Sequence, residues 1–327
     1  MTETISRITR RTALALAAAA AFAPAAAFAQ ASYPAKTITF VCGFPAGSGA
    51  DVLVRYFAEK VAAVSGATII VENKLGAAGG IAAEYTARSQ PDGHTIFVHS
   101  GNAIAGSMSL MKNPPVDAAK DLQTIATINK QAFMLTVRAD SPHQNVADLV
   151  EALKQKGTSA LYAFNAPSGR VLGAEFNLLA GLNAEPVQYA SAPDSVNDMM
   201  AGHVDFGAHD PVFALSQMRE GRWRALAIGS GERMKGIPDV PTFKEQGYEI
   251  DQLGWWGVMV PAAVPADVVG TINGWFNEVL SQADTQEFLT RQGGDVFVST
   301  PAEAQQWMVD SITEWSRLIN LAGIEPQ

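Results

Sequence analysis

The residues best suited to hold a small anion lie in a turn near the start of the chain. Residues 43–51 read Gly-Phe-Pro-Ala-Gly-Ser-Gly-Ala-Asp and follow a short apolar run. Small residues let a ligand approach the backbone, and the first N–H groups of a following helix attract anions such as carboxylates or phosphates. The turn lacks the Lys-Ser or Lys-Thr of a Walker loop and the Gly-x-Gly-x-x-Gly of a dinucleotide site. An ordinary strand-to-helix turn is the alternative interpretation.

Three further loops also follow apolar runs: residues 76–80, 100–102 and 165–170. The first, Gly-Ala-Ala-Gly-Gly, suits either an anion or close packing of a helix on a strand. The last ends in Arg170, and a guanidinium at a helix start opposes the helix dipole. A ligand carboxylate held by two parallel hydrogen bonds would explain Arg170, and a solvated arginine or an internal ion pair is the alternative.

Metal and nucleophile chemistry find little support in the chain. The five histidines form no His-x-x-x-His pattern and no Cys/His cluster, and no Gly-x-Ser-x-Gly turn is present. We therefore expect no metal, no cofactor and no catalysis, with an exported hydrolase using His209 and Asp210 as the alternative. Cys42 is the only cysteine, so an intramolecular disulfide is excluded. Trp255 and Trp256 are interpreted either as packed core or as an aromatic wall for a ring-bearing ligand.

The elements that would position these loops alternate between short β-type runs and amphipathic helical patterns. This alternation predicts an α/β architecture with mainly parallel sheets. Ligands of such sheets bind beyond the carboxyl ends of the strands, where these loops lie. The expected strands cover residues 37–42, 67–71, 95–99, 133–138, 160–164, 186–189, 204–208, 225–228 and 255–260. The expected helices cover residues 51–64, 81–89, 145–156, 171–180, 194–201, 266–281 and 301–321.

The first residues predict export. Residues 1–29 are interpreted as a signal peptide, because a basic segment with Arg7, Arg10 and Arg11 precedes an apolar run and cleavage is expected after Ala29 or Ala31. Ordinary and twin-arginine export both fit this segment. No later run approaches the roughly 18–20 apolar residues that a membrane span needs.

The charge of the mature chain excludes one class of partner. The formal net charge of the full chain is −9. Loss of the signal peptide removes three arginines and one glutamate, which makes the mature chain still more acidic, at −11. Nucleic-acid binding requires a clustered basic surface, and the sequence contains no such cluster. The negative net charge does not exclude an anionic ligand, because binding in a buried site depends on a few local hydrogen-bond donors.

Several short segments occur in an order that resembles one family. They are residues 44–51 (FPAGSGAD), 71–84 (VENKLGAAGGIAAE), 91–93 (PDG), 202–205 (GHVD), 224–227 (RALA), 238–242 (PDVPT) and 256–261 (WGVMVP). From Tyr33 to the C-terminal region, the chain resembles the Bug/TctC family, the periplasmic solute-binding proteins of tripartite tricarboxylate transporters.

The resemblance implies a type II periplasmic-binding-protein fold with two α/β lobes, two crossovers and a cleft that closes on its ligand. Lobe 1 would comprise residues 33–138 and 255–327, and lobe 2 residues 139–254. The crossovers would fall near Arg138 and Gly254. In this family, two loops corresponding to residues 44–51 and 165–170 hold carboxylates through backbone amides and waters.

The chain departs from the family pattern in three places. Gly49-Ala50 stands where many members have Gly-Thr. Arg170-Val171 stands where the second loop is usually one residue longer and runs through a Ser-His pair. His209 stands where an aspartate is common. The last two departures predict a more cationic cleft, suited to a dicarboxylate or a dicarboxylic aromatic acid.

The sequence therefore predicts a monomeric periplasmic protein that captures a small organic carboxylate and delivers it to the membrane components of a tripartite transporter. A ligand-sensing partner of a membrane receptor is the alternative. The expected ligand-binding residues are Phe44, Ala46, Gly47, Ser48, Gly49, Ala50, Asp51, Ser100, Asn102, Asn165, Ser168, Arg170, His209 and Asp210. A second group comprises Gly79, Gly80, Tyr189, Trp255 and Trp256.

Overall fold

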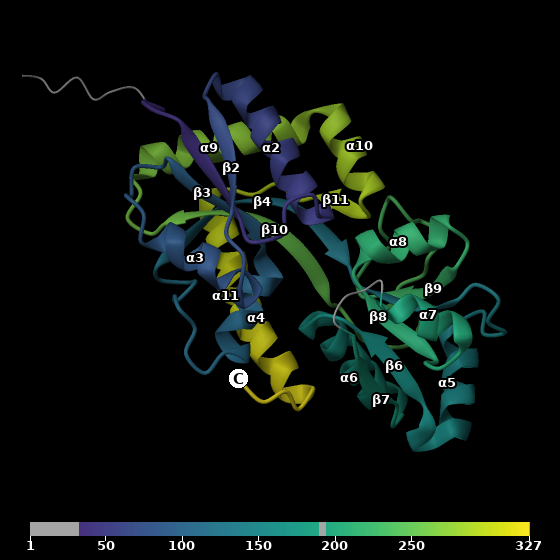
Figure 1. Ribbon diagram of the computed structural model, residues 1–327. Helices are drawn as coiled ribbons and strands as arrows, with labels where there is room; N and C mark the ends of the chain where they lie inside the picture. The colour runs from purple at the N-terminus through teal and green to yellow at the C-terminus, as the bar shows by residue number, and fades with distance from the viewer. Residues whose placement is uncertain (1–32, 190–193, 327) are drawn as a thin grey trace, which may run out of the picture. The chain divides into compact units, whose positions relative to one another are not determined.

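Two mixed sheets organise the residues that the computed structural model describes, 33–189 and 194–326 (Figure 1). The expected signal peptide and both cleavage positions lie outside these residues. The first sheet has the order β11-β4-β10-β3-β1-β2 and the second β7-β6-β8-β5-β9. The first comprises β1 (Ile38–Cys42), β2 (Ile69–Asn73), β3 (Thr95–Ser100), β4 (Leu122–Ala132), β10 (Leu253–Pro261) and β11 (Gly294–Val296). The second comprises β5 (Met134–Arg138), β6 (Leu161–Phe164), β7 (Glu185–Gln188), β8 (Phe206–His209) and β9 (Trp223–Ile228).

Helices cover both faces of the first sheet (Figure 1). On one face, Phe57 of α2 and Phe276 of α9 stack with ring centroids 5.8 Å apart, and Phe276 also stacks on Phe40 of β1. On the other face, α3, α4 and α11 form a shared core with Phe97 and Met259. The bounds are α2 (Gly49–Ser65), α3 (Gly80–Ala87), α4 (Gly101–Leu110), α9 (Ala266–Ser281), α10 (Ala283–Arg291) and α11 (Pro301–Leu321), with the short 3₁₀ helix η1 (Ala77–Gly79). Because both faces are buried, β1 is apolar along most of its length.

The second sheet has the same layered arrangement. Phe176 of α6 and Leu149 of α5 pack against Phe206 on one face, and Met199 of α7 packs beside Trp223 on the other. The bounds are α5 (Val146–Lys156), α6 (Pro167–Ala180), α7 (Asp194–Ala201) and α8 (Pro211–Arg219), with 3₁₀ helices η2 (Gly157–Ser159) and η3 (Lys244–Gln246). Among the residues described, no helix is both long and apolar enough to cross a membrane.

The sheets differ from expectation in strand direction and in the place of the first crossover. The pairs β1–β2, β1–β3, β6–β7 and β6–β8 are parallel, whereas β10 and β5 run antiparallel to their neighbours. Both sheets are therefore mixed, because a strand that carries the chain from one sheet to the other enters in the opposite direction. The chain changes sheet at Phe133, so β5 belongs to the second sheet and not to the first lobe as expected. One residue separates β4 from β5, and so short a link leaves no turn signal in the sequence.

Candidate functional site

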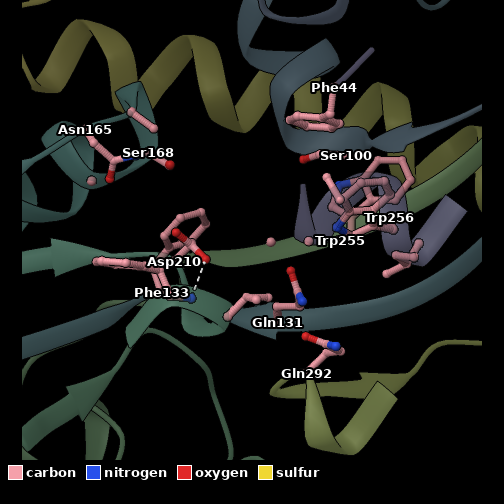
Figure 2. A pocket seen from close by; sticks show the side chains of 18 of the residues that line it. Phe44, Ser100, Gln131, Phe133, Asn165, Ser168, Asp210, Trp255, Trp256 and Gln292 are labelled. Carbon is pink, nitrogen blue, oxygen red and sulfur yellow. Dashed lines mark hydrogen bonds between the residues drawn. The ribbon is translucent and has the colours of Figure 1, made fainter. Parts of the chain in front are cut away.

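A cavity of about 520 Å³ lies beyond the carboxyl ends of β1, β3, β6 and β8. Elements of both sheets contribute to its wall, and Figure 2 shows Phe44, Ser100 and Trp256 on one side of the view and Asn165, Ser168 and Asp210 on the other. The lining residues are Phe44, Gly49, Ala50, Leu53, Ser100, Gln131, Phe133, Asn165, Ala166, Ser168, Gly169, Ala208, Asp210, Val212, Phe213, Ser216, Gly254, Trp255, Trp256 and Gln292.

Helix starts supply backbone N–H groups to this wall. Helix α2 begins at Gly49 and α6 at Pro167, and the first-turn N–H groups of Gly49, Ala50 and Ser168 have no intrahelical acceptor. These residues line the cavity. The wall therefore offers neutral donors, aided by the helix dipoles, to a negatively charged group.

Asp51 shapes the first glycine-rich turn and does not line the cavity. Its carboxylate accepts hydrogen bonds from the Gly47 N–H, Asn73 Nδ2 and Arg55 Nε, each at 2.8 Å. Burial raises the pKa of Asp51, but the hydrogen bonds from Arg55, Asn73 and Gly47 outweigh burial and hold this pKa at about 2. Ser48 caps α2 by accepting the Asp51 N–H. These contacts fix the turn so that Gly49 and Ala50 face the cavity.

An aromatic stack forms part of the wall. The Phe44 ring stacks on His99 with centroids 4.4 Å apart and planes at 10°, and its centroid lies 5.6 Å from that of Trp256. His99 is fully buried, and burial lowers its pKa to about 4. The ring behind Phe44 is therefore neutral near pH 7. This side of the cavity suits an apolar or aromatic part of a ligand.

Asp210 contributes a carboxylate to the wall. It caps α8, and its Oδ1 accepts the Phe213 N–H at 3.1 Å. Burial raises the pKa of Asp210, and backbone hydrogen bonds only partly offset this effect.

The structure brings nine of the expected site residues into this wall: Phe44, Gly49, Ala50, Ser100, Asn165, Ser168, Asp210, Trp255 and Trp256. Ala46, Gly47, Ser48 and Asp51 belong to the supporting turn instead. Trp255 is 1 % exposed and donates its indole N–H to Ser311 Oγ, so it is mainly core, whereas Trp256 packs beside Phe44.

Arg170 and His209 do not line the cavity, in contrast to their expected role. Successive side chains of a strand alternate between faces, so Ala208 and Asp210 reach the cavity while His209 turns to the opposite side. There its Nε2 lies 3.1 Å from Ser195 Oγ, and burial lowers its pKa to about 3. Arg170 lines a separate cavity with Phe164 and other residues. The expectation of a cationic cleft thereby loses its structural basis.

Four other expected residues have structural roles. Asn102 binds the start of β10, donating to the Leu253 carbonyl and accepting the Trp255 N–H. Gly79 lies against His99, so that a Cβ at this position would approach the ring to 2.6 Å, and Gly80 packs against Pro115. The Tyr189 hydroxyl donates to Asp198. The loop of residues 76–80 therefore allows close packing of a helix on a strand, which was the alternative interpretation of this loop.

Several lining residues were missed by the sequence interpretation. Gln131 lies near the end of β4, Phe133 is the single residue between β4 and β5, and Gln292 follows α10. Neither β4 nor α10 was expected, so Gln131 and Gln292 had no assigned position, whereas Phe133 was expected to begin the strand of residues 133–138. The signal that could have identified Gln131 was its polar amide, which lies within a largely buried strand. Phe213 and Ser216 lie on α8, which was also unexpected.

No group of three or more His, Cys, Asp or Glu side chains within the described ranges could hold a metal ion.

Comparison with known proteins identifies relatives of this chain. A family model described as the tripartite tricarboxylate transporter family receptor, TctC, matches residues 53–324. Protein BugT of Bordetella pertussis is 28% identical over 296 residues, which cover 89% of this chain and 91% of BugT.

Solved structures share the fold. R. palustris Rpa4515 with adipate has a TM-score of 0.80 at 23% identity, covering 90% of this chain and all of Rpa4515 (100%). MatC from Rhodopseudomonas palustris with bound malate has a TM-score of 0.74 at 25% identity, covering 88% of this chain and all of MatC (100%). The two-lobe α/β fold of the periplasmic binding proteins is therefore shared by this chain.

Proposed function

Because the chain belongs to the tripartite tricarboxylate transporter receptor family, TctC, we propose that it captures a small organic carboxylate in the 520 Å³ cavity and delivers it to a transporter. The observation that carries the proposal is the cavity between elements of both sheets, with free N–H groups at the starts of α2 and α6. MatC, a relative of similar fold, has malate bound.

The site would hold the carboxylate without a cationic side chain. Each charge-assisted hydrogen bond from a neutral donor is about twice as strong as a neutral one. The N–H groups of Gly49, Ala50 and Ser168 are the candidate donors of these bonds, with the amide of Asn165 as a further one. Phe44 and Trp256 would contact the apolar part of the ligand.

The cellular setting follows from the expected signal peptide and the family. The mature chain would act in the periplasm as a monomer, and its partners would be membrane components of a tripartite transporter. Lobe 1 would carry the first sheet and lobe 2 the second, joined at Phe133 and at residues 229–252. The ligand would leave unchanged, which mass spectrometry of the recovered ligand can check.

Isothermal titration with carboxylates and with their neutral primary amides tests this proposal. We expect at least one carboxylate to bind and its amide to bind at least about tenfold more weakly, because the helix starts favour a negative charge. Equal affinity of acid and amide, or no binding by any carboxylate in a broad aliphatic and aromatic panel, would contradict the proposal.

A proline substitution tests the donors directly. Gly49 is the first residue of α2, a position that tolerates proline, so Gly49→Pro removes one N–H and keeps the helix. A Cβ at this position would lie 3.6 Å from Val212, an ordinary contact. We expect carboxylate affinity to fall about tenfold, which corresponds to one charge-assisted hydrogen bond. The matched control, Ala266→Pro at the first position of α9, should bind normally.

A further inference from the structure

Asp210 is the one charged side chain among the described residues that line the cavity. The remaining polar side chains of the wall are uncharged: Ser100, Gln131, Asn165, Ser168, Ser216 and Gln292, with the indoles of Trp255 and Trp256. The net formal charge of this wall is therefore negative, although the cavity is proposed to receive an anion.

The two carboxylates near the cavity have opposite surroundings. Asp51 is neutralised by Arg55 and takes two further hydrogen bonds. Asp210 accepts backbone N–H groups at the start of α8, and no cationic side chain of the described residues acts on it. A half-buried carboxylate without a cation is costly, and burial accordingly raises the pKa of Asp210. The charge of Asp51 is used within the protein, whereas that of Asp210 remains available to a ligand.

The fold places Asp210 beside one of the two helix starts. A Cβ on Gly169 would lie 2.3 Å from the Ala208 carbonyl oxygen, so α6 begins directly against the end of β8. Asp210 follows Ala208 by two residues and points to the same side of the strand. Its charge opposes an anion at the start of α6. The start of α2, with Gly49 and Ala50, has its own aspartate already paired with Arg55 and is the better place for the ligand carboxylate.

We propose that the ligand carries an ammonium group in addition to its carboxylate, and that Asp210 selects it by pairing with that ammonium. The ligand class is then a zwitterionic amino acid, with its carboxylate at the start of α2 and its ammonium at Asp210. The proposal rests on the proposed function. A second carboxylate in place of the ammonium is repelled by Asp210, which reverses the preference expected from Arg170 and His209.

Matched ligand series test this selection. Titration calorimetry compares 4-aminobutanoate, 5-aminopentanoate and 6-aminohexanoate with the monocarboxylates and dicarboxylates of equal chain length. At the best length, we expect the amino acid to bind at least about tenfold tighter than the monocarboxylate, and the dicarboxylate to bind most weakly. The three chain lengths vary the separation between the carboxylate and the ammonium.

Asp210→Asn is the decisive variant, because asparagine caps a helix as well as aspartate does and the fold is retained. We expect it to lose the preference for the amino acid and to gain affinity for the dicarboxylate. Asp210→Ser also keeps the helix cap and should give the same order of ligand affinities as Asp210→Asn. Asp267→Asn, at the exposed start of α9, should leave the order of affinities of the unsubstituted protein unchanged.

The outcomes separate the two proposals. If monocarboxylates bind but amino acids bind no better, or if Asp210→Asn leaves the order unchanged, the role of Asp210 is overturned while carboxylate capture stands. If no member of any series binds, nor any carboxylate of the wider panel, carboxylate capture itself fails and the role of Asp210 fails with it.

Discussion

At the scale of single residues, burial and hydrogen bonding decide what each ionisable group can do. His99 and His209 are fully buried, and their lowered pKa values keep them neutral near pH 7. Neither therefore supplies a positive charge near pH 7. By contrast, the carboxylate of Asp51 accepts hydrogen bonds from three donor groups, which hold it in its charged form. The chemistry of a residue type is thus set by its surroundings.

Asp51→Asn tests the stabilising role of that charge. A pKa lowered from 3.8 to about 2 corresponds to roughly 2 kcal/mol of folding stability, since one pKa unit equals about 1.4 kcal/mol. Because the pKa is lower in the folded state, this stability is present above about pH 4 and is lost as the pH falls toward 2. Urea unfolding should show the variant about 2 kcal/mol less stable at pH 7, with a smaller difference at pH 3.

Asp267→Asn is the control for this charge change, because Asp267 is exposed in the first turn of α9. It should alter stability by less than about 0.5 kcal/mol. An equal effect of the two substitutions at pH 7 would show that the Asp51 contacts add nothing to stability.

At the scale of elements, the hydrophobic periodicity of the sequence predicted the bounds of several helices. Helices α7, α9 and α11 have the expected bounds, and Asn145 and Gly157 cap α5 as predicted. Two of the missed helices, α4 and α8, begin after the capping residues Ser100 and Asp210, so a cap alone did not reveal a helix. Helix α4 follows β3 directly, with Ser100 serving both as the last strand residue and as the helix cap. Strand β4 contains the buried amides Asn129 and Gln131, which break the apolar pattern.

The candidate site was predictable to the level of loops but not of side-chain direction. Alternation of strands and helices placed residues 43–51, 100–102 and 165–170 at the carboxyl ends of strands, and the cavity lies there. The direction of His209 depends on whether β8 extends to residue 209, which sequence periodicity left one residue short. The direction of Arg170 depends on the face of α6 that packs against β8. Both depend on tertiary contacts that no local pattern encodes.

Gly79→Ala tests the packing of the glycine-rich loop of residues 76–80. Gly79 has φ +95°, and a Cβ would lie 2.6 Å from the His99 ring, which is also stacked on Phe44. We expect a loss of roughly 2–4 kcal/mol in urea unfolding, from the backbone strain and the overlap together. Gly247→Ala has a similar φ of +89° but nothing within 4 Å, so it should cost only about 1 kcal/mol. Equal losses would exclude the His99 contact as a cause.

At the scale of the whole chain, the second sheet is inserted into the first. Strand β4 leads into β5, and β10 brings the chain back after β9. The cavity wall includes Gly49 from one side of this division and Val212 from the other. A ligand that contacts elements of both sheets would draw the two sheets closer together. The full binding energy is gained only in the conformation where both sets of contacts exist.

Small-angle X-ray scattering with and without the best carboxylate tests this approach. We expect the radius of gyration to fall on binding, and the free energy of unfolding to rise by about 2.7 kcal/mol at a ligand concentration of 100 times the Kd. The amide that fails to bind serves as control. An unchanged radius of gyration under conditions where calorimetry shows saturation would rule out closure.

The position of β10 also sets the order in which the molecule can be completed during biosynthesis. β10 lies between β3 and β4, although more than a hundred residues separate it from either strand along the chain. Until the ribosome has made residues 253–261, the facing edges of β3 and β4 have no partner and the first sheet cannot close. Such long-range pairing slows folding. The first sheet therefore stays incomplete until most of the chain has been made.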